Sequence, residues 1–149
     1  MAEEFDPLNI KSQLCFPIYA CAREIQKAYT PFLEDLDLTY TQYITMMVMW
    51  EHRDISVREL GKILYLDSGT LTPVVKNLEK KGLVTKHRDP QDERVVIVSI
   101  TDAGMELKNK AKEIPAKIAC AYKLPKEDAI QLYQLMYKLL GMISIDENN

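Results

Sequence analysis

The chain has 149 residues, of which 47 % are hydrophobic, and this length suits a single domain with a real core. Its net charge of −3 and isoelectric point near 5.5 exclude a protein that attracts polyanions through its overall charge. No apolar run approaches about 18 residues, and the acidic N-terminus lacks a signal-peptide pattern, so we expect no membrane span and a cytoplasmic protein. Three scattered cysteines and two isolated histidines indicate free thiols, with no disulfide framework and no metal site.

The first part of the chain is predicted to be helical. A helix should begin near Leu14 and end at about Leu33, with Pro17 near its start, where a missing N–H costs little. Residues 39–42 form a capping box, in which the Thr and Gln side chains satisfy each other's free backbone amides. This box opens a very apolar helix over residues 43–50, which we expect to be buried on nearly all sides.

The central part of the chain predicts two more helices joined by a turn. Residues 56–59 form a second capping box, which opens a short helix. Residues 66–69 turn into a helix over about residues 70–81, whose first turn should contain Pro73. Gly82 is a suitable residue to end that helix.

A β-hairpin and two further helices follow. Residues 84–88 and 94–100 are rich in strand-forming residues and are joined by a turn-forming pentapeptide. A long helix should run over about residues 101–121, disturbed at Pro115, before a last helix over residues 127–143. The predicted fold is therefore mainly α with a small β-hairpin wing, a winged helix-turn-helix whose apolar first and last helices are natural dimerisation elements.

The helix over about residues 70–81 is a candidate to read a DNA major groove. Residues 53–94 carry nine basic side chains against seven acidic ones, whereas residues 1–52 carry three against eight. Small hydroxyl residues near the start of the helix can approach bases and phosphates, and an amide or a lysine can contact base edges. The candidate DNA-binding residues here are Ser68, Thr70, Thr72, Lys76 and Asn77. The alternative for this helix alone is a solvated polar face.

The hairpin strengthens the prediction of DNA binding. Lys86 and Arg88 lie on its first strand, and Asp92 and Arg94 lie at its turn. An arginine at a hairpin tip suits a narrow minor groove, and Asp92 is placed to pair with Arg94 and aim it. The alternative is a surface ion pair that contributes little stability. A reading helix followed directly by a wing indicates double-stranded DNA as the partner.

Two motifs of the hairpin region resemble the MarR family of winged-helix transcriptional regulators, namely Asp92-Glu93-Arg94 and Thr101-Asp102-Ala103-Gly104. Three longer motifs, at residues 13–16, 38–43 and 65–73, resemble the organic hydroperoxide resistance regulators (OhrR-type), which are repressors released by oxidation of one cysteine.

The resemblance implies one MarR-like domain over residues 1–149, with dimerisation by about residues 1–36 and 102–149 and DNA binding by about residues 37–101. It implies a homodimer on a pseudo-palindromic operator. Thr41 and Pro17 depart from the proline and the aliphatic residue that this subfamily leads us to expect.

The same resemblance assigns roles to thiols and tyrosines. The sensing cysteine corresponds to Cys15, and two tyrosines that bind it across the dimer correspond to Tyr29 and Tyr40. A further tyrosine, one turn after the cysteine, corresponds to Tyr19. The position of Cys120 resembles the resolving cysteine of a two-cysteine branch, and the alternatives are a buried substitute for alanine and resolution by a small thiol.

Elementary chemistry supports a reactive Cys15. The first turn of a helix stabilises a thiolate, and tyrosine hydroxyls can donate to it without adding charge. Phe16, Ile18 and the methionines of the apolar helix (Met46, Met47 and Met49) should make its surroundings apolar, which favours organic hydroperoxides. The alternative for any one cysteine is a small inert hydrophobe, and this is our interpretation of Cys21.

The sequence thus predicts a DNA-binding repressor, with organic hydroperoxide as inducer, that needs no cofactor and is not an enzyme. One alternative is a MarR-type regulator gated by a small phenolic ligand without thiol chemistry. Another is a thiol peroxidase, which is disfavoured because no arginine or threonine arrangement for peroxide activation accompanies Cys15 and because the winged helix would be unexplained.

Overall fold

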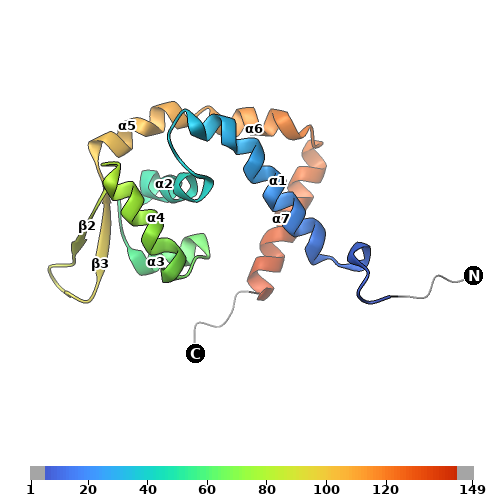
Figure 1. Ribbon diagram of the computed structural model, residues 1–149, viewed down its shortest axis with the longest axis horizontal. Coiled ribbons are helices and arrows are strands. Elements are labelled where there is room, and N and C mark those ends of the chain that lie inside the picture. Colours follow the sequence, from blue (N-terminus) through green and yellow to red (C-terminus); the bar gives the residue numbers. More distant parts are fainter. Residues whose placement is uncertain (1–5, 144–149) are drawn as a thin grey trace, which may run out of the picture. The chain divides into compact units, whose positions relative to one another are not determined.

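The computed structural model describes residues 6–143, and the chain divides into two compact units, one up to Ile114 and one from Pro115 (Figure 1). Each unit is described by itself. The first contains the helix-turn-helix and a small antiparallel sheet, and the second contains most of the two last helices.

The first unit begins with a 3₁₀ turn, η1 (Ile10–Ser12), and a long helix, α1 (Cys15–Glu34). Pro17 is the third residue of α1, where it removes no helical hydrogen bond, as expected. Pro31, which the sequence analysis did not consider, lies near the other end of α1 and deprives one carbonyl of its partner. The capping box at Thr39 and Gln42 is present, with both reciprocal hydrogen bonds, and opens α2 (Tyr40–His52).

The helix-turn-helix consists of α3 (Val57–Leu64) and α4 (Ser68–Lys80). The side chain of Ser56 caps α3, and the side chain of Asp67 caps α4. The cap at Asp67 starts α4 two residues earlier than expected. The expectation that Pro73 lies in the first turn is therefore wrong, because it is the sixth residue of α4.

The wing is the hairpin of β2 (Val84–Arg88) and β3 (Val96–Ile100), and β1 (Asp54–Ser56) adds a third strand that the sequence did not predict. The order is β1-β3-β2 and both pairings are antiparallel. Arg94 lies before β3 and not within it, because its backbone N–H donates to the Asp92 carboxylate instead of to the ladder.

The core of the first unit lies between α2, the helix-turn-helix and the sheet. Its fully buried side chains come from α2 (Met46 and Met49), from α3 and α4 (Leu60, Leu71 and Leu78) and from the sheet (Val84 and Val98). The expectation that residues 43–50 are buried on nearly all sides is confirmed for six of the eight, whereas Ile44 is half-buried and Met47 is 45 % exposed.

Helix α5 (Asp102–Ala111) packs closely on this core at Gly104. A Cβ on Gly104 would overlap the Leu83 carbonyl oxygen and lie 2.7 Å from Cγ1 of Ile100. The Gly104 carbonyl accepts a buried hydrogen bond of 2.8 Å from the Trp50 indole N–H. Glycine is therefore required where α5 meets the turn at the end of α4.

The long helix expected after the wing is two helices, α5 and α6 (Ile114–Tyr122). The break falls just before Pro115, whose ring would clash with the carbonyl four residues earlier. Helix α7 (Lys126–Ile143) agrees with the expected last helix and exposes much of its apolar surface. Among the described helices, none combines the length and apolar character that a membrane span requires.

Candidate DNA-reading head and thiol site

The start of α4 is fixed by Asp67. Its carboxylate accepts a 2.7 Å hydrogen bond from the Thr70 N–H, and this contact lowers the pKa of Asp67. Leu71, Val75 and Leu78 turn inward and are buried. The opposite face is exposed and carries all five residues expected to contact DNA, namely Ser68, Thr70, Thr72, Lys76 and Asn77.

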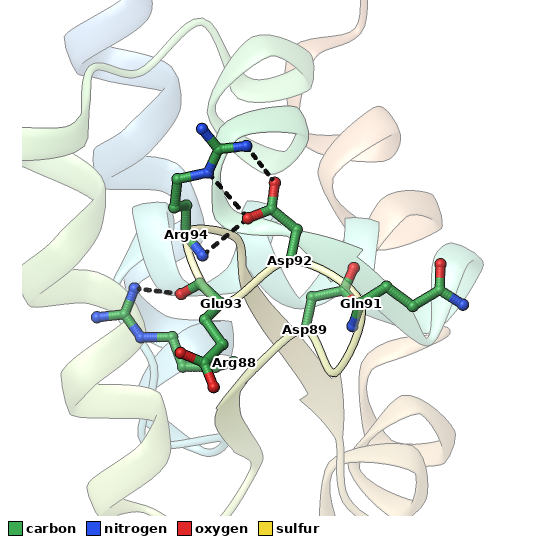
Figure 2. Close-up of polar contacts among 6 residues, drawn as sticks. All are labelled: Arg88, Asp89, Gln91, Asp92, Glu93 and Arg94. Carbon is green, nitrogen blue, oxygen red and sulfur yellow. Dashed lines mark hydrogen bonds and ion pairs between the residues drawn. The ribbon is translucent and has the colours of Figure 1, made fainter.

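The tip of the wing is an ordered turn built around Asp92 and Arg94. Figure 2 shows the Arg94 guanidinium against the Asp92 carboxylate, with Nε to Oδ1 at 3.0 Å and a second contact to Oδ2 at 3.1 Å. This pairing lowers the pKa of Asp92 and raises that of Arg94. The two-point contact with Asp92 fixes the direction of the Arg94 guanidinium. Because the Arg94 side chain is 90 % exposed, the guanidinium stays available for a partner.

The other two wing residues are exposed on β2. The guanidinium of Arg88 donates to the Glu93 carbonyl at 3.2 Å and so braces the tip from below (Figure 2). The backbone N–H of Lys86 donates to the carboxylate of Glu79 at 3.0 Å. Glu79 belongs to the last turn of α4, so it ties the reading helix to the wing. No local pattern in the sequence indicates this role of Glu79, because Glu79 and Lys86 meet only when β2 folds back beside α4.

Cys15 is the first residue of α1, and its thiol is exposed. Leu14 precedes it in helical conformation and offers no side-chain cap to the first turn. Of the methionines expected beside it, Met46 and Met49 are buried in the core of the winged helix and Met47 is 45 % exposed, so the apolar pocket at Cys15 stays a prediction. Cys21 and Cys120 are also exposed in the single chain, so the roles expected for them stay predictions.

The expected tyrosines do not meet Cys15 within one chain. Tyr29 is 14 positions further along α1, which corresponds to about 21 Å of helix axis. Tyr40 packs edge-to-face on Tyr29, with ring centroids 5.1 Å apart. Tyr19 is 58 % exposed, and its hydroxyl accepts a 3.4 Å hydrogen bond from Arg23.

Tyr29 and Tyr40 belong to an aromatic cluster that continues into the core. Tyr43 lies 5.6 Å from Tyr29 and 6.3 Å from Trp50, measured between ring centroids. Burial raises the pKa of Tyr40, and burial together with Tyr40 raises that of Tyr43. These phenols therefore stay protonated at neutral pH and keep a hydroxyl to donate.

A groove of about 440 Å³ lies beside Tyr40, between α1 and the segment that leads into α2. Its lining combines charged and amide side chains of α1 with the capping segment of α2, namely Arg23, Gln26, Lys27, Thr30, Leu33, Glu34, Leu38, Thr39 and Tyr40. Within residues 6–143, no three His, Cys, Asp or Glu side chains gather in a way that would hold a metal ion.

Comparisons with known proteins agree with this architecture. The family model described as "Transcriptional regulator SarA/Rot" matches residues 27–111. The organic hydroperoxide resistance transcriptional regulator of Bacillus subtilis is 45 % identical over 140 residues, which cover 94 % of this chain and 95 % of that protein. The chain therefore belongs to the SarA/Rot family of transcriptional regulators, together with the organic hydroperoxide resistance regulators.

Solved structures of AbfR, from Staphylococcus epidermidis, are similar as well. Reduced AbfR bound to DNA has a TM-score of 0.75 at 28 % identity, covering 91 % of this chain and 94 % of that one. Disulfide-formed AbfR has a TM-score of 0.64 at 31 % identity, covering 87 % and 91 %.

Proposed function

We propose that this regulator is a repressor that binds operator DNA as a homodimer and releases it when organic hydroperoxide oxidises Cys15. The observation that carries the proposal is the exposed thiol at the first residue of α1, in a chain that also presents a reading helix and an aimed wing arginine. The hydroperoxide is a signal in this proposal, and the chain acts as a cytoplasmic regulator and not as an enzyme.

The DNA-reading head would dock as a winged helix does. The exposed face of α4, from Ser68 to Asn77, enters the major groove, and Arg94 reaches the neighbouring minor groove. In the wing, Lys86 and Arg88 contact phosphates. Arg88 also braces the tip, and Asp92 aims the Arg94 guanidinium. The AbfR relatives bound to DNA support this assignment.

A dimer follows from the geometry of the thiol site. Tyr29 and Tyr40 adjoin each other but lie about 21 Å from Cys15 of their own chain, so they would receive the thiol of a second copy. The exposed apolar residues of α7 are suited to burial between the same two copies. Residues 1–36 and 102–149 would then form the dimerisation region, and residues 37–101 the DNA-binding lobe on a pseudo-palindrome.

The chemistry has two balanced steps. The Cys15 thiolate attacks the hydroperoxide, which leaves a sulfenic acid on the protein and releases the alcohol. Cys120 of the partner then condenses with the sulfenic acid to form a disulfide and water. Both thiols are exposed, and the relative AbfR has a disulfide-formed structure. Tyr19, Tyr29 and Tyr40 support the reacting sulfur through neutral hydroxyl groups.

Intact mass and operator binding test the proposal together, before and after one equivalent of cumene hydroperoxide. Wild type should lose operator and give a covalent dimer on a non-reducing gel. Cys15→Ser should keep its operator, and Cys120→Ser should oxidise without forming the dimer. Cys21→Ser, the matched control, should behave as wild type.

A Cys15→Ser protein that still releases its operator under peroxide would overturn thiol sensing. Release of operator by a small phenol in that variant would favour a ligand-gated regulator. A monomeric mixed disulfide with added small thiol, and none between subunits, would refute only the role of Cys120.

A further inference from the structure

Lys81, the residue that ends the reading helix, is tied to the loop between α1 and α2. Its ammonium donates to the backbone carbonyl of Asp37 and forms an ion pair with Oδ2 of the same residue at 3.3 Å. It also donates to Oε1 of Gln42 at 3.3 Å. The Lys81 side chain is 28 % exposed and that of Asp37 is 90 % exposed, so this three-point contact is a surface junction between segments about 40 positions apart in the sequence.

The loop end of this junction has an unusual backbone. Asp37 adopts a left-handed conformation with φ of 52°, which few residues other than glycine adopt without cost. It ends α1 in a tight turn, in which the Leu38 N–H donates to the Leu33 carbonyl at 3.0 Å. Since Lys81 holds both the carbonyl and the carboxylate of Asp37, it stabilises a turn that the local sequence alone would hold weakly.

The same segment also lines the groove beside the tyrosines. Leu38, Thr39 and Tyr40 line the 440 Å³ groove, and Tyr40 contacts Tyr29. The Gln42 oxygen that accepts from Lys81 also accepts the Thr39 N–H at 3.1 Å. Residues 37–42 are therefore one hydrogen-bonded segment between the reading helix and the tyrosines.

The other end of the junction is continuous with the reading helix. The backbone N–H of Lys81 donates to the Asn77 carbonyl at 3.1 Å, and Asn77 is one of the exposed residues of the DNA-reading face. A continuous chain of hydrogen bonds thus joins segment 37–42, through the Lys81 ammonium, to the end of α4.

We propose that Lys81 is a positioning residue that couples the thiol site to the reading helix, so that a change at Tyr40 moves α4 relative to the operator. This inference rests on the proposed function, because it concerns how oxidation is transmitted. Both ends belong to the same compact unit, so the junction can act within each subunit.

The test compares wild type with Lys81→Met, which keeps most of the side-chain length and removes the ammonium. Operator dissociation constants are measured for the reduced protein and for protein oxidised with cumene hydroperoxide, with oxidation quantified by intact mass. In Lys81→Met, Cys15 should oxidise at the wild-type rate, but the ratio of oxidised to reduced dissociation constants should fall at least about fivefold. The oxidised variant should therefore stay on its operator.

Three further variants separate coupling from charge and stability. Lys108→Met removes one exposed cation of α5 and should keep the wild-type ratio, so a lower ratio is not an effect of net charge. Lys81→Arg should restore coupling in part because it keeps a cationic donor. Asp37→Asn keeps the backbone carbonyl and tolerates the left-handed turn, and it should lower the ratio even if Lys81→Met does not fold.

Oxidised wild type in the same assay distinguishes a failure of the proposed function from a failure of the coupling role of Lys81. If oxidised wild type keeps its operator, the proposed function fails. If wild type releases its operator and both Lys81→Met and Asp37→Asn release it to the same extent, the coupling role of Lys81 is overturned while the proposed function stands.

Discussion

The assembly of the thiol site from two subunits can be tested with a mixed dimer. Cys15 and Tyr29 are 14 positions apart on α1, so about 21 Å of helix axis separates them, and Tyr40 adjoins Tyr29. A hydrogen bond to a thiolate needs a separation of only about 3–4 Å, so no side-chain rotation closes the distance within one chain. The prediction that these tyrosines support Cys15 therefore requires the thiol of a partner subunit.

The perturbation is a heterodimer of one Cys15→Ser subunit and one Tyr40→Phe subunit, isolated with two different affinity tags. Its single Cys15 belongs to the Tyr40→Phe chain and faces the intact Tyr40 of the partner. Loss of one hydroxyl donor to the thiolate should slow oxidation by about tenfold in the Tyr40→Phe homodimer. In the heterodimer the thiol should react at the wild-type rate.

The assay follows intact mass over time after one equivalent of cumene hydroperoxide, and the tags distinguish the two subunits. The control is a heterodimer of a wild-type subunit and a subunit with both Cys15→Ser and Tyr40→Phe. Its remaining Cys15 belongs to the wild-type subunit, faces the phenylalanine of the partner and should react slowly. A heterodimer thiol as slow as that of the Tyr40→Phe homodimer would refute assembly in trans.

The remaining predictions concern the DNA-reading head and the effect of pH. Arg94→Ala should weaken operator binding by roughly five- to 150-fold without a change in melting temperature, because the side chain is almost fully exposed; unchanged affinity would remove the wing from the interface. Gly104→Ala should lower the free energy of unfolding by about 1–3 kcal/mol in urea titrations, and a neutral effect would contradict the close approach of α5. Asp67 has a lowered pKa in the folded state, so its stabilising charge is present above its ordinary value of 3.8 and is lost as the pH falls through the folded value. The difference in melting temperature between wild type and Asp67→Ala should accordingly be full at neutral pH and shrink in acid. Tyr40 has a raised pKa, so its stabilising contribution is present below pH 10.0 and is lost at more alkaline pH. Absorbance titration should show two late-ionising tyrosines, Tyr40 and Tyr43, and one fewer in Tyr40→Phe.

The sequence by itself determined the features that depend on neighbours within one turn. The capping box at Thr39 was predicted because a hydroxyl and an amide three residues later satisfy local groups, and of the box predicted at Ser56 only the cap by the Ser56 hydroxyl is present. The pairing of Asp92 with Arg94 was predicted for the same reason, since two positions separate them. The exposed face of α4 followed from helical periodicity.

Only the tertiary structure decided the contacts between distant segments. Strand β1 is three residues long, too short for a periodic signal, and it exists because β3, more than 40 positions away, offers a free edge. Glu79 meets Lys86 and Lys81 meets Asp37 only after the chain has folded back on itself. The place at which Met46 is buried is decided in the same way, whereas the expected pocket at Cys15 stays a prediction. The hydrophobic side chain of Met46 predicts burial, but it does not indicate which residues it packs against. In the structure Met46 is buried in the densely packed core of the winged helix.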